Sequence, residues 1–309
     1  MGMVTRVATF TAALWVGTMA SDVRAAGYTE TEYPIVLAHG ASGFDSLFGV
    51  FDYWNGLEYS LERSGAEVYV TQVSQFGSTE DRGAQLLAQV EEIVALSGSP
   101  RVNIIGHSHG GLDARWVAAQ RPDLVASVTS VASPHQGAEL ADFLRDTVEE
   151  GSFGETVLAG MAGGLGSLIA LLSGTYNPQD PLGTLDSLST DGMATFNAAY
   201  PQGLPAEWCG EGDAVVDGVH YFSWTGDRAV TNIFDISDAA FGLTSLVYDE
   251  DNDGLVGQCS AHLGTVIRDD YDQNHLDAVN HVFGMVHWWS SSPKTLFRQH
   301  ANRLRNLGL

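Results

Sequence analysis

Basic residues are scarce in this chain of 309 residues. It contains 14 lysine and arginine residues against 38 aspartate and glutamate residues, with Lys294 as its single lysine, so its formal net charge is -24. Nucleic acids and anionic membrane surfaces, which carry many negative charges themselves, are therefore poor partners. Because salt screens the self-repulsion of so acidic a surface, we hypothesise that the protein works in a saline habitat.

The sequence also lacks internal repeats and linkers rich in proline or serine. Hydrophobic residues make up 44% of it, enough for one packed core, so we expect a single domain over residues 27–309. The apolar run at residues 7–19 is too short to span a bilayer, and no later run is long enough, so no transmembrane segment is expected. Because Arg6 precedes this run and small residues follow it, we expect residues 1–26 to be a cleaved secretory signal peptide.

Cysteine is rare as well, since Cys209 and Cys259 are the two cysteines of the chain. Outside the cytoplasm such a pair can form a disulfide, and closing a loop of roughly fifty residues would stabilise the protein by about 4 kcal/mol on chain-entropy grounds. Two separate buried thiols are the alternative. Composition does not decide between them.

Residues 102–119 combine a strand pattern, a glycine-rich turn and a helix pattern. The run 102–105, apolar except for Asn103, leads into Gly-x-Ser-x-Gly at positions 106–110, and a helix-like segment follows at 112–119. This context is typical of a nucleophile elbow, in which only small residues fit the sharp turn and the serine stands exposed. We therefore predict that Ser108 is a nucleophile and that the amide of His109 stabilises negative charge on a substrate oxygen. The alternative is a glycine-rich turn that holds an ordinary serine.

Strand and helix patterns alternate along the chain. Strands are predicted at residues 33–38, 66–73, 125–132 and 218–225, a helix up to Gly98, and a closing helix at 293–306. This alternation predicts an α/β fold, with a mostly parallel central sheet flanked by helices and a site at the carboxyl ends of its strands. The glycine-rich loop 39–44 follows the first strand, so the amide of Ala41 is the candidate second donor to an oxyanion.

A serine nucleophile on such an elbow takes its acid and its base from later in the chain, in the order Ser, then Asp or Glu, then His. We predict His275 as the base because it lies in a polar loop past the last predicted strand. The other late histidines, His262, His281, His287 and His300, lie in helix-like contexts or follow that loop. Asp253 is the predicted acid because it directly precedes Gly254 and an apolar pair, so it can turn inward.

The acidic loop around Asp253 begins like an EF-hand calcium loop. Its twelfth position, which should be a bidentate glutamate, is Ser260, and no helices flank the loop in the sequence pattern. We therefore do not expect an EF-hand there.

Residues 151–174 interrupt the alternation with a glycine-rich apolar stripe at helical spacing. Its glycines make it a poor helix by propensity, and such a segment next to a nucleophile suggests a lid that covers an apolar site and opens at an interface. An ordinary core helix is the alternative.

With these residues assembled, the chain resembles the secreted bacterial triacylglycerol lipases of the Pseudomonas type. The matching motifs cover essentially the whole mature chain, at residues 33–40, 106–111, 252–257 and 298–303. The resemblance implies an α/β-hydrolase fold and hydrolysis of triacylglycerol esters at an oil-water interface. It also implies the site residues: Ser108 as nucleophile, Asp253 as acid, His275 as base, and the amides of Ala41 and His109 as the oxyanion hole.

The same resemblance implies a disulfide between the two cysteines and one structural Ca²⁺ ion. The implied calcium ligands are the carboxylates of Asp235 and Asp277 and the main-chain carbonyls of His281 and Met285. Members of this group usually need a membrane-anchored, lipase-specific foldase chaperone in the periplasm and are exported by type II secretion. A foldase is therefore an expected partner, and the extracellular medium is the expected destination.

Three positions depart from the usual pattern of that group. Ala41 and Ser42 are smaller or more polar than the apolar residues more common in the oxyanion loop, which leaves acyl-chain preference open. His281 stands where glutamine is usual, but the implied metal ligand is only its carbonyl. A short-chain carboxylesterase or a phospholipase on the same fold is the nearest alternative function. A non-catalytic lipid-binding module is a more distant one, and its sign would be a broken triad.

Overall fold

The computed structural model describes residues 27–309 except 42, 44–45, 48–50, 148–176, 233, 236, 282–283 and 288. The predicted signal peptide at 1–26, the predicted lid at 151–174 and Ser42 lie outside the described residues. Within the described part of the chain, no helix has both the length and the apolar character needed to cross a membrane.

A seven-stranded sheet forms the centre of the described structure. Five strands lie side by side and run parallel, in the order β4 (Val68–Thr71), β1 (Ile35–Ala38), β5 (Val102–His107), β6 (Val125–Val131) and β8 (Val219–Gly226). Beyond β8, β9 (Thr265–Tyr271) pairs with it in parallel and the short β7 (Val215–Val216) in antiparallel fashion. Two further short strands, β2 (Ser46–Leu47) and β3 (Phe51–Asp52), pair with each other. The predicted mostly parallel sheet is therefore confirmed.

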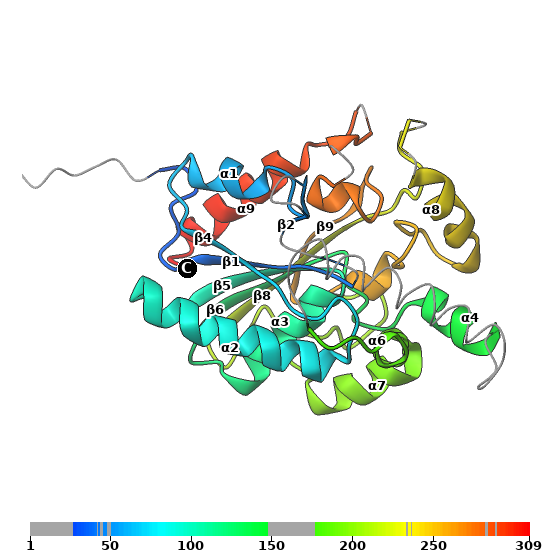
Figure 1. Ribbon diagram of the computed structural model, residues 1–309, viewed down its shortest axis with the longest axis horizontal. Coiled ribbons are helices and arrows are strands. Elements are labelled where there is room, and N and C mark those ends of the chain that lie inside the picture. The colour runs from blue at the N-terminus through cyan, green and yellow to red at the C-terminus, as the bar shows by residue number, and fades with distance from the viewer. Residues whose placement is uncertain are drawn as a thin grey trace, which may run out of the picture.

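Helices cover both faces of the sheet, as Figure 1 shows. On one face, Ile35 and Leu37 of β1 join a core cluster with α1 (Leu57–Glu62) and α9 (Pro293–Asn306). On the other face, Val36 and Ala38 join a cluster with α2 (Thr79–Ser97) and α3 (His109–Gln120). Successive residues of a strand point to opposite faces, so a strand buried on both sides must be apolar throughout, as β1 is.

Among the described residues, four further helices gather at the carboxyl end of the strands (Figure 1). They are α4 (Glu139–Thr147), α6 (Pro181–Leu188), α7 (Thr190–Ala199) and α8 (Asp238–Thr244), accompanied by the 3-10 turns η1 (Ser245–Val247), η2 (Cys259–Ala261) and η3 (Asp277–Val279). Residues of α4, α6 and α8 line one cavity together with the loops that follow β1, β5, β6 and β9. The strand ends and these helices therefore enclose the candidate site between them.

The predicted helix at 293–306 is confirmed with the same bounds, and Gly98, with a φ of 69°, ends α2 as predicted. The strand predicted at 218–225 is confirmed as β8, but the strand β9 that follows it was not predicted. β9 runs along the sheet edge half exposed and carries Arg268, Asp269 and Asp270, so it lacks the apolar run by which the earlier strands were found.

Candidate active site

Ser108 lies at the sharp turn between β5 and α3. Its φ is positive, at 55°, a conformation that residues with side chains rarely adopt. Glycines permit this turn: a side chain on Gly106 would collide with the backbone of Gly110, and one on Gly110 would collide with the backbone of Ala38. The predicted strand-turn-helix unit is therefore present, and it presents Ser108 to the cavity.

His275 and Asp253 form a buried pair beside Ser108. The Nδ1 of His275 donates to Oδ2 of Asp253 at 2.7 Å, and the two residues are 3% and 0% exposed. The other carboxylate oxygen of Asp253 accepts the amides of Leu255 and Val256, at 3.0 and 2.8 Å, so the loop backbone orients the carboxylate. Because Nδ1 carries the proton in this arrangement, Nε2 of His275 is free to act as a base.

Two other aspartates of this acidic loop, Asp249 and Asp251, do not join the pair. Asp249 and Asp251 are exposed, whereas Asp253 is buried and directly precedes Gly254, whose φ is 99°. His275 and Ser108 line the same cavity, so three residues that are far apart in the sequence come together there.

The loop after β1 carries the candidate oxyanion donor Ala41, which lines the cavity. Nε2 of His39 accepts the amide of Val73 at 3.2 Å, so its proton lies on Nδ1, which donates to the carbonyl oxygen of Gly40 at 2.8 Å. Burial lowers the pKa of His39 to about 3, which keeps the ring neutral. The bonded carbonyl of Gly40 shares its peptide group with the N–H of Ala41, so this contact orients and polarises the proposed donor.

The second candidate donor is the amide of His109. As the first residue of α3, His109 has a backbone N–H without an acceptor inside the helix, because the first four amides of any helix lack one. Its side chain is fully buried, and Nε2 lies 2.9 Å from the hydroxyl of Thr79. Burial holds the pKa of His109 well below its usual value, so its ring is neutral and adds no charge at the positive end of the helix dipole.

Arg82, on α2, holds the loop that carries Ala41 against α2 and α3. It is fully buried and bonds to the carboxylate of Asp113 on α3 at 2.7 Å. The same guanidinium donates to the carbonyl oxygen of His39 at 2.8 Å and to that of Ser74. A buried ion pair that also satisfies neighbouring carbonyls is costly to break from one side, so the backbone before Ala41 is held firmly.

The cavity over Ser108 has a volume of about 450 Å³ and mostly apolar walls. Besides Ser108, His275, Ala41, Tyr53 and His281, the described residues of its lining are Pro134, Ala138, Leu140, Ala141, Leu144, Leu185, Leu188, Phe241, Leu255, Val256 and Leu276. Such a site favours a ligand with an extended apolar part and a single polar group next to the serine.

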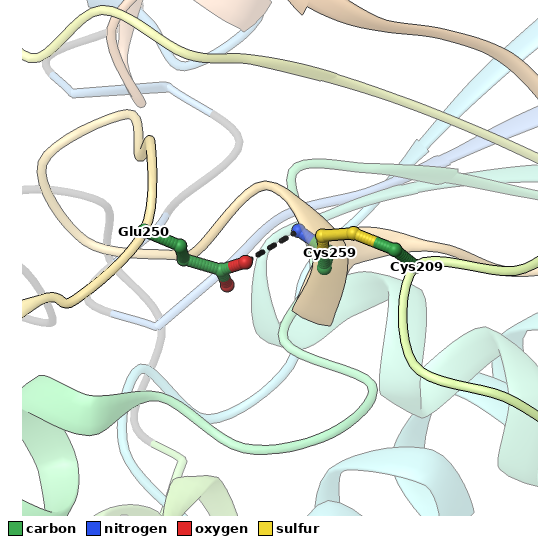
Figure 2. A group of neighbouring side chains, drawn as sticks. All are labelled: Cys209, Glu250 and Cys259. Carbon is green, nitrogen blue, oxygen red and sulfur yellow. Dashed lines mark hydrogen bonds between the residues drawn. A yellow bond between two sulfur atoms is a disulfide. The ribbon is translucent and has the colours of Figure 1, made fainter.

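Cys209 and Cys259 form a disulfide, as expected, with their Cα atoms 4.5 Å apart. Figure 2 shows the carboxylate of Glu250 beside this bond, where it accepts the amide of Cys259 at 3.3 Å. The two sulfurs and the carboxylate are close enough together to suggest a metal site. We do not assign one there, because sulfurs joined in a disulfide are not thiolates and thiolates are the metal-binding form of cysteine.

A second group of carboxylates lies next to the His275 loop. Asp235, Asp238 and Asp277 are 4%, 3% and 1% exposed. Asp238 accepts the amides of Thr231 and Asn232, whereas Oδ2 of Asp235 is buried without a hydrogen-bond partner among the described residues. Burial raises the pKa of Asp277 to about 7, with a further contribution from the negative charges of Asp238 and Asp235. A buried carboxylate oxygen that lacks a donor fits a bound cation.

The remaining predicted calcium ligands lie on the same loop. His281 follows η3, and its carbonyl oxygen accepts the amide of Gly284 at 2.9 Å, which leaves a second lone pair. Burial lowers the pKa of its side chain. Met285 is partly buried four residues further on. The residues present are therefore compatible with the predicted Ca²⁺ ion, which takes carboxylate and carbonyl oxygens.

Three residues of the site were not predicted: Tyr53, Arg82 and His107. All three are buried and hydrogen-bonded close to Ser108 or to the loop before Ala41. No local pattern marks Tyr53 or Arg82. His107 occupies a variable position of the Gly-x-Ser-x-Gly motif, and a polar residue at the end of a fully buried strand was the signal available for it.

Comparison with known proteins gives consistent matches over the whole described fold. Residues 33–299 match the family model described as alpha/beta hydrolase fold. A triacylglycerol lipase from Vibrio cholerae is 54% identical over 301 residues, covering 97% of this chain and 96% of its own. One from Pseudomonas fragi is 43% identical, covering 90% and 98%. The crystal structure of the mature Bacillus licheniformis lipase BlEst2 is similar in fold, with a TM-score of 0.59 at 20% identity and coverage of 91% and 94%.

Proposed function

The chain belongs to the alpha/beta hydrolase family and is a triacylglycerol lipase, and we propose that Ser108, His275 and Asp253 carry out its ester hydrolysis. The observation that carries this assignment is the geometry of the three residues. A serine on a strained turn and a histidine bonded to a buried carboxylate face one apolar cavity. These are the parts of a nucleophilic triad.

In this mechanism Nε2 of His275 takes the proton of Ser108 Oγ as the oxygen attacks the ester carbonyl carbon. The negative charge that develops on the carbonyl oxygen is held by the amides of Ala41 and His109. When the tetrahedral intermediate collapses, His275 returns the proton to the leaving alcohol and an acyl-serine remains. A water molecule, deprotonated by His275, then attacks the acyl-serine, and His275 returns that proton to Ser108 Oγ as the acyl–Oγ bond breaks and the fatty acid leaves. Asp253 keeps the proton of His275 on Nδ1 and stabilises the imidazolium form.

Replacement of the nucleophile tests this assignment. Ser108→Ala should lower kcat by about three to six orders of magnitude while leaving the fold intact, as triad deletions do. Ser133→Ala is the matched control, because Ser133 is also buried close to the elbow helix but is not part of the cavity lining. We expect that control to keep kcat within about threefold of the unmodified enzyme. Substantial turnover by pure, folded Ser108→Ala protein would refute the assignment.

We further propose that one Ca²⁺ ion lies between Asp235 and Asp277 and has a structural role. The supporting observation is the buried Oδ2 of Asp235, which has no hydrogen-bond partner among the described residues. Asp277 is two residues from His275, so a cation shared by the two carboxylates would hold the base in place and relieve their mutual repulsion. The carbonyls of His281 and Met285 would complete the protein ligands.

Chelation tests the calcium proposal. Exhaustive EDTA treatment should lower both the melting temperature and the activity, and added calcium should restore them. Asp277→Asn should abolish this response, whereas Asp251→Asn, which changes an exposed carboxylate of the neighbouring loop, should preserve it. Unchanged stability and full activity in metal-free protein would show that Asp235 and Asp277 bind nothing important.

Export and interfacial activation remain part of the proposal. We propose that residues 1–26 direct secretion through the periplasm, that a foldase assists folding there, and that residues 151–174 act as a lid. The yield of refolded, active enzyme with and without the foldase tests whether the foldase is a partner.

The lid is tested with tributyrin. The rate should rise sharply once tributyrin exceeds its solubility and forms droplets, because the apolar stripe of an open lid can then pack against an apolar surface instead of water. Smooth saturation through that limit would count against a lid.

A further inference from the structure

Two buried residues outside the triad connect its two sides by an unbroken chain of hydrogen bonds. The amide of Gly40 donates to the hydroxyl oxygen of Tyr53 at 3.2 Å. That hydroxyl lies 2.6 Å from Nδ1 of His107, and Nε2 of His107 lies 2.9 Å from the carbonyl oxygen of His275. Tyr53 and His107 are 4% and 0% exposed. This chain of hydrogen bonds thus begins at Gly40, the residue before Ala41, and ends on the carbonyl oxygen of His275.

The direction of every bond in this chain follows from the chemistry of its ends. A carbonyl oxygen only accepts, so Nε2 of His107 must carry the proton that it shares with His275. Burial and the neighbouring histidines hold the pKa of His107 well below its usual value, so the ring is neutral and Nδ1 is a lone-pair acceptor. The Tyr53 hydroxyl therefore donates to Nδ1 while its oxygen accepts the amide of Gly40. Burial also raises the pKa of Tyr53, so the hydroxyl keeps its proton.

Both ends of this chain of hydrogen bonds lie close to the triad. A side chain on Gly40 would approach Cβ of Ser108 to 2.7 Å, so the backbone there has no space to shift toward the nucleophile. At the other end, the rings of His107 and His275 lie 4.6 Å apart, and the amide of His275 donates to the carbonyl oxygen of Asp253 at 3.0 Å. The contacts of His107 thus set the position of the His275 backbone, while Asp253 sets the orientation of its ring.

We propose that Tyr53 and His107 are positioning residues, which keep the Ala41 amide and the His275 imidazole in register with Ser108. The inference rests on the triad assignment above. Neither residue takes up or releases a proton during the reaction; each acts through the backbone that it holds. Misplacement of catalytic groups by about 1 Å costs on the order of a hundredfold in rate, so loss of this chain should appear in kcat.

Three substitutions test the proposal. Tyr53→Phe keeps the ring in the cavity wall but removes the hydroxyl, His107→Leu removes both ring nitrogens, and His107→Gln supplies an amide with one acceptor and one donor. We expect the first two to lower kcat about ten- to hundredfold with KM changed less than about threefold, because each leaves buried polar groups unpaired. His107→Gln should recover at least about half of that loss on a logarithmic scale.

The assay must separate misalignment from unfolding. The rate is measured on a soluble short-chain p-nitrophenyl ester. The concentration of active sites is measured separately, by labelling the serine with a phosphonate until the reaction is complete, and the rate is divided by it to give kcat per active site. Tyr69→Phe and His300→Leu are the matched controls: the Tyr69 hydroxyl bonds to exposed Glu67, and buried His300 bonds to Thr129 away from the cavity. We expect His300→Leu to lower the melting temperature without lowering kcat per site.

The outcomes distinguish failure of the positioning role from failure of the triad assignment. If Tyr53→Phe and His107→Leu keep kcat per labelled site within twofold of the unmodified enzyme, the positioning role is refuted, even if they lower the melting temperature. If His107→Leu does not fold, Tyr53→Phe alone decides, since Phe fills the same space. If the phosphonate does not label Ser108 in the unmodified enzyme, the triad assignment fails rather than the positioning role.

Discussion

Mild acid should destabilise this protein through its buried histidines. Five buried histidines, His39, His107, His109, His135 and His300, are at most 1% exposed. Burial lowers the pKa of His39 and His300 to about 3, helped by the charges of Arg82 and Arg303. Burial also holds the pKa of the other three well below the usual value. These rings are therefore neutral when folded but take up protons near pH 6.5 when unfolded.

The sign and size of the effect follow from proton linkage. Because the pKa is lower in the folded state, the stabilising contribution is fully present above pH 6.5 and is lost as pH falls toward the folded value. Each histidine costs about 1.3 kcal/mol between pH 7 and 5.5, so five cost about 6 kcal/mol. Asp113, whose pKa burial raises to about 6, opposes this trend by about 1 kcal/mol. A net loss of about 5 kcal/mol is a large part of a typical free energy of unfolding.

Urea unfolding followed by tryptophan fluorescence at pH 8, 7, 6 and 5.5, with saturating calcium, measures this loss directly. Replacing one buried histidine, as in His300→Leu, should reduce the slope of stability against pH by about 1.4 kcal/mol per pH unit below pH 6. A free energy of unfolding that stays constant or rises from pH 7 to pH 5.5 would refute the reasoning, because it would mean that the folded state accepts these protons.

Three further predictions concern the triad, the disulfide and the surface. Asp253→Asn should lower kcat by about 10⁴ by favouring the wrong tautomer of His275, with the melting temperature nearly unchanged, and a loss below tenfold would argue against Asp253 as the acid. Reduction of the Cys209 to Cys259 disulfide should lower the free energy of unfolding by about 2 to 5 kcal/mol, measured in urea with and without reductant. The melting temperature and activity should rise from low to molar NaCl because salt screens a net charge of -24, and a maximum at low salt would contradict the saline hypothesis.

Local patterns were sufficient to predict the elements that position the nucleophile. β5, the elbow and α3 all carry their signals within twenty consecutive residues, and α9 has a proline in its first turn and a glycine past its end. β9 was missed because an edge strand with charged residues lacks an apolar run. No element was predicted in the region of α6 and α7, although each begins at a capping side chain, Asp180 or Ser189, that a closer search for N-caps would find.

Contacts between distant side chains could not be predicted from the residues alone. The order of the motifs suggested His275 and Asp253, but their bond across 22 residues depends on how two loops fold together. Tyr53, directly after β3, and His107, at the end of β5, are 54 residues apart, and their bond depends on how the turn after β3 packs against the sheet. Sequence patterns report local conformation and burial, whereas such networks arise from sheet order and loop packing.

Covalent labelling tests the central claim most directly. The unmodified enzyme is incubated with a p-nitrophenyl phosphonate ester, whose phosphorus mimics the tetrahedral intermediate, and the modified peptide is identified by mass spectrometry. The triad assignment predicts one phosphonyl group per molecule, bound to Ser108, with activity lost in proportion to labelling. A label on another residue, or full activity after stoichiometric labelling of Ser108, would contradict it.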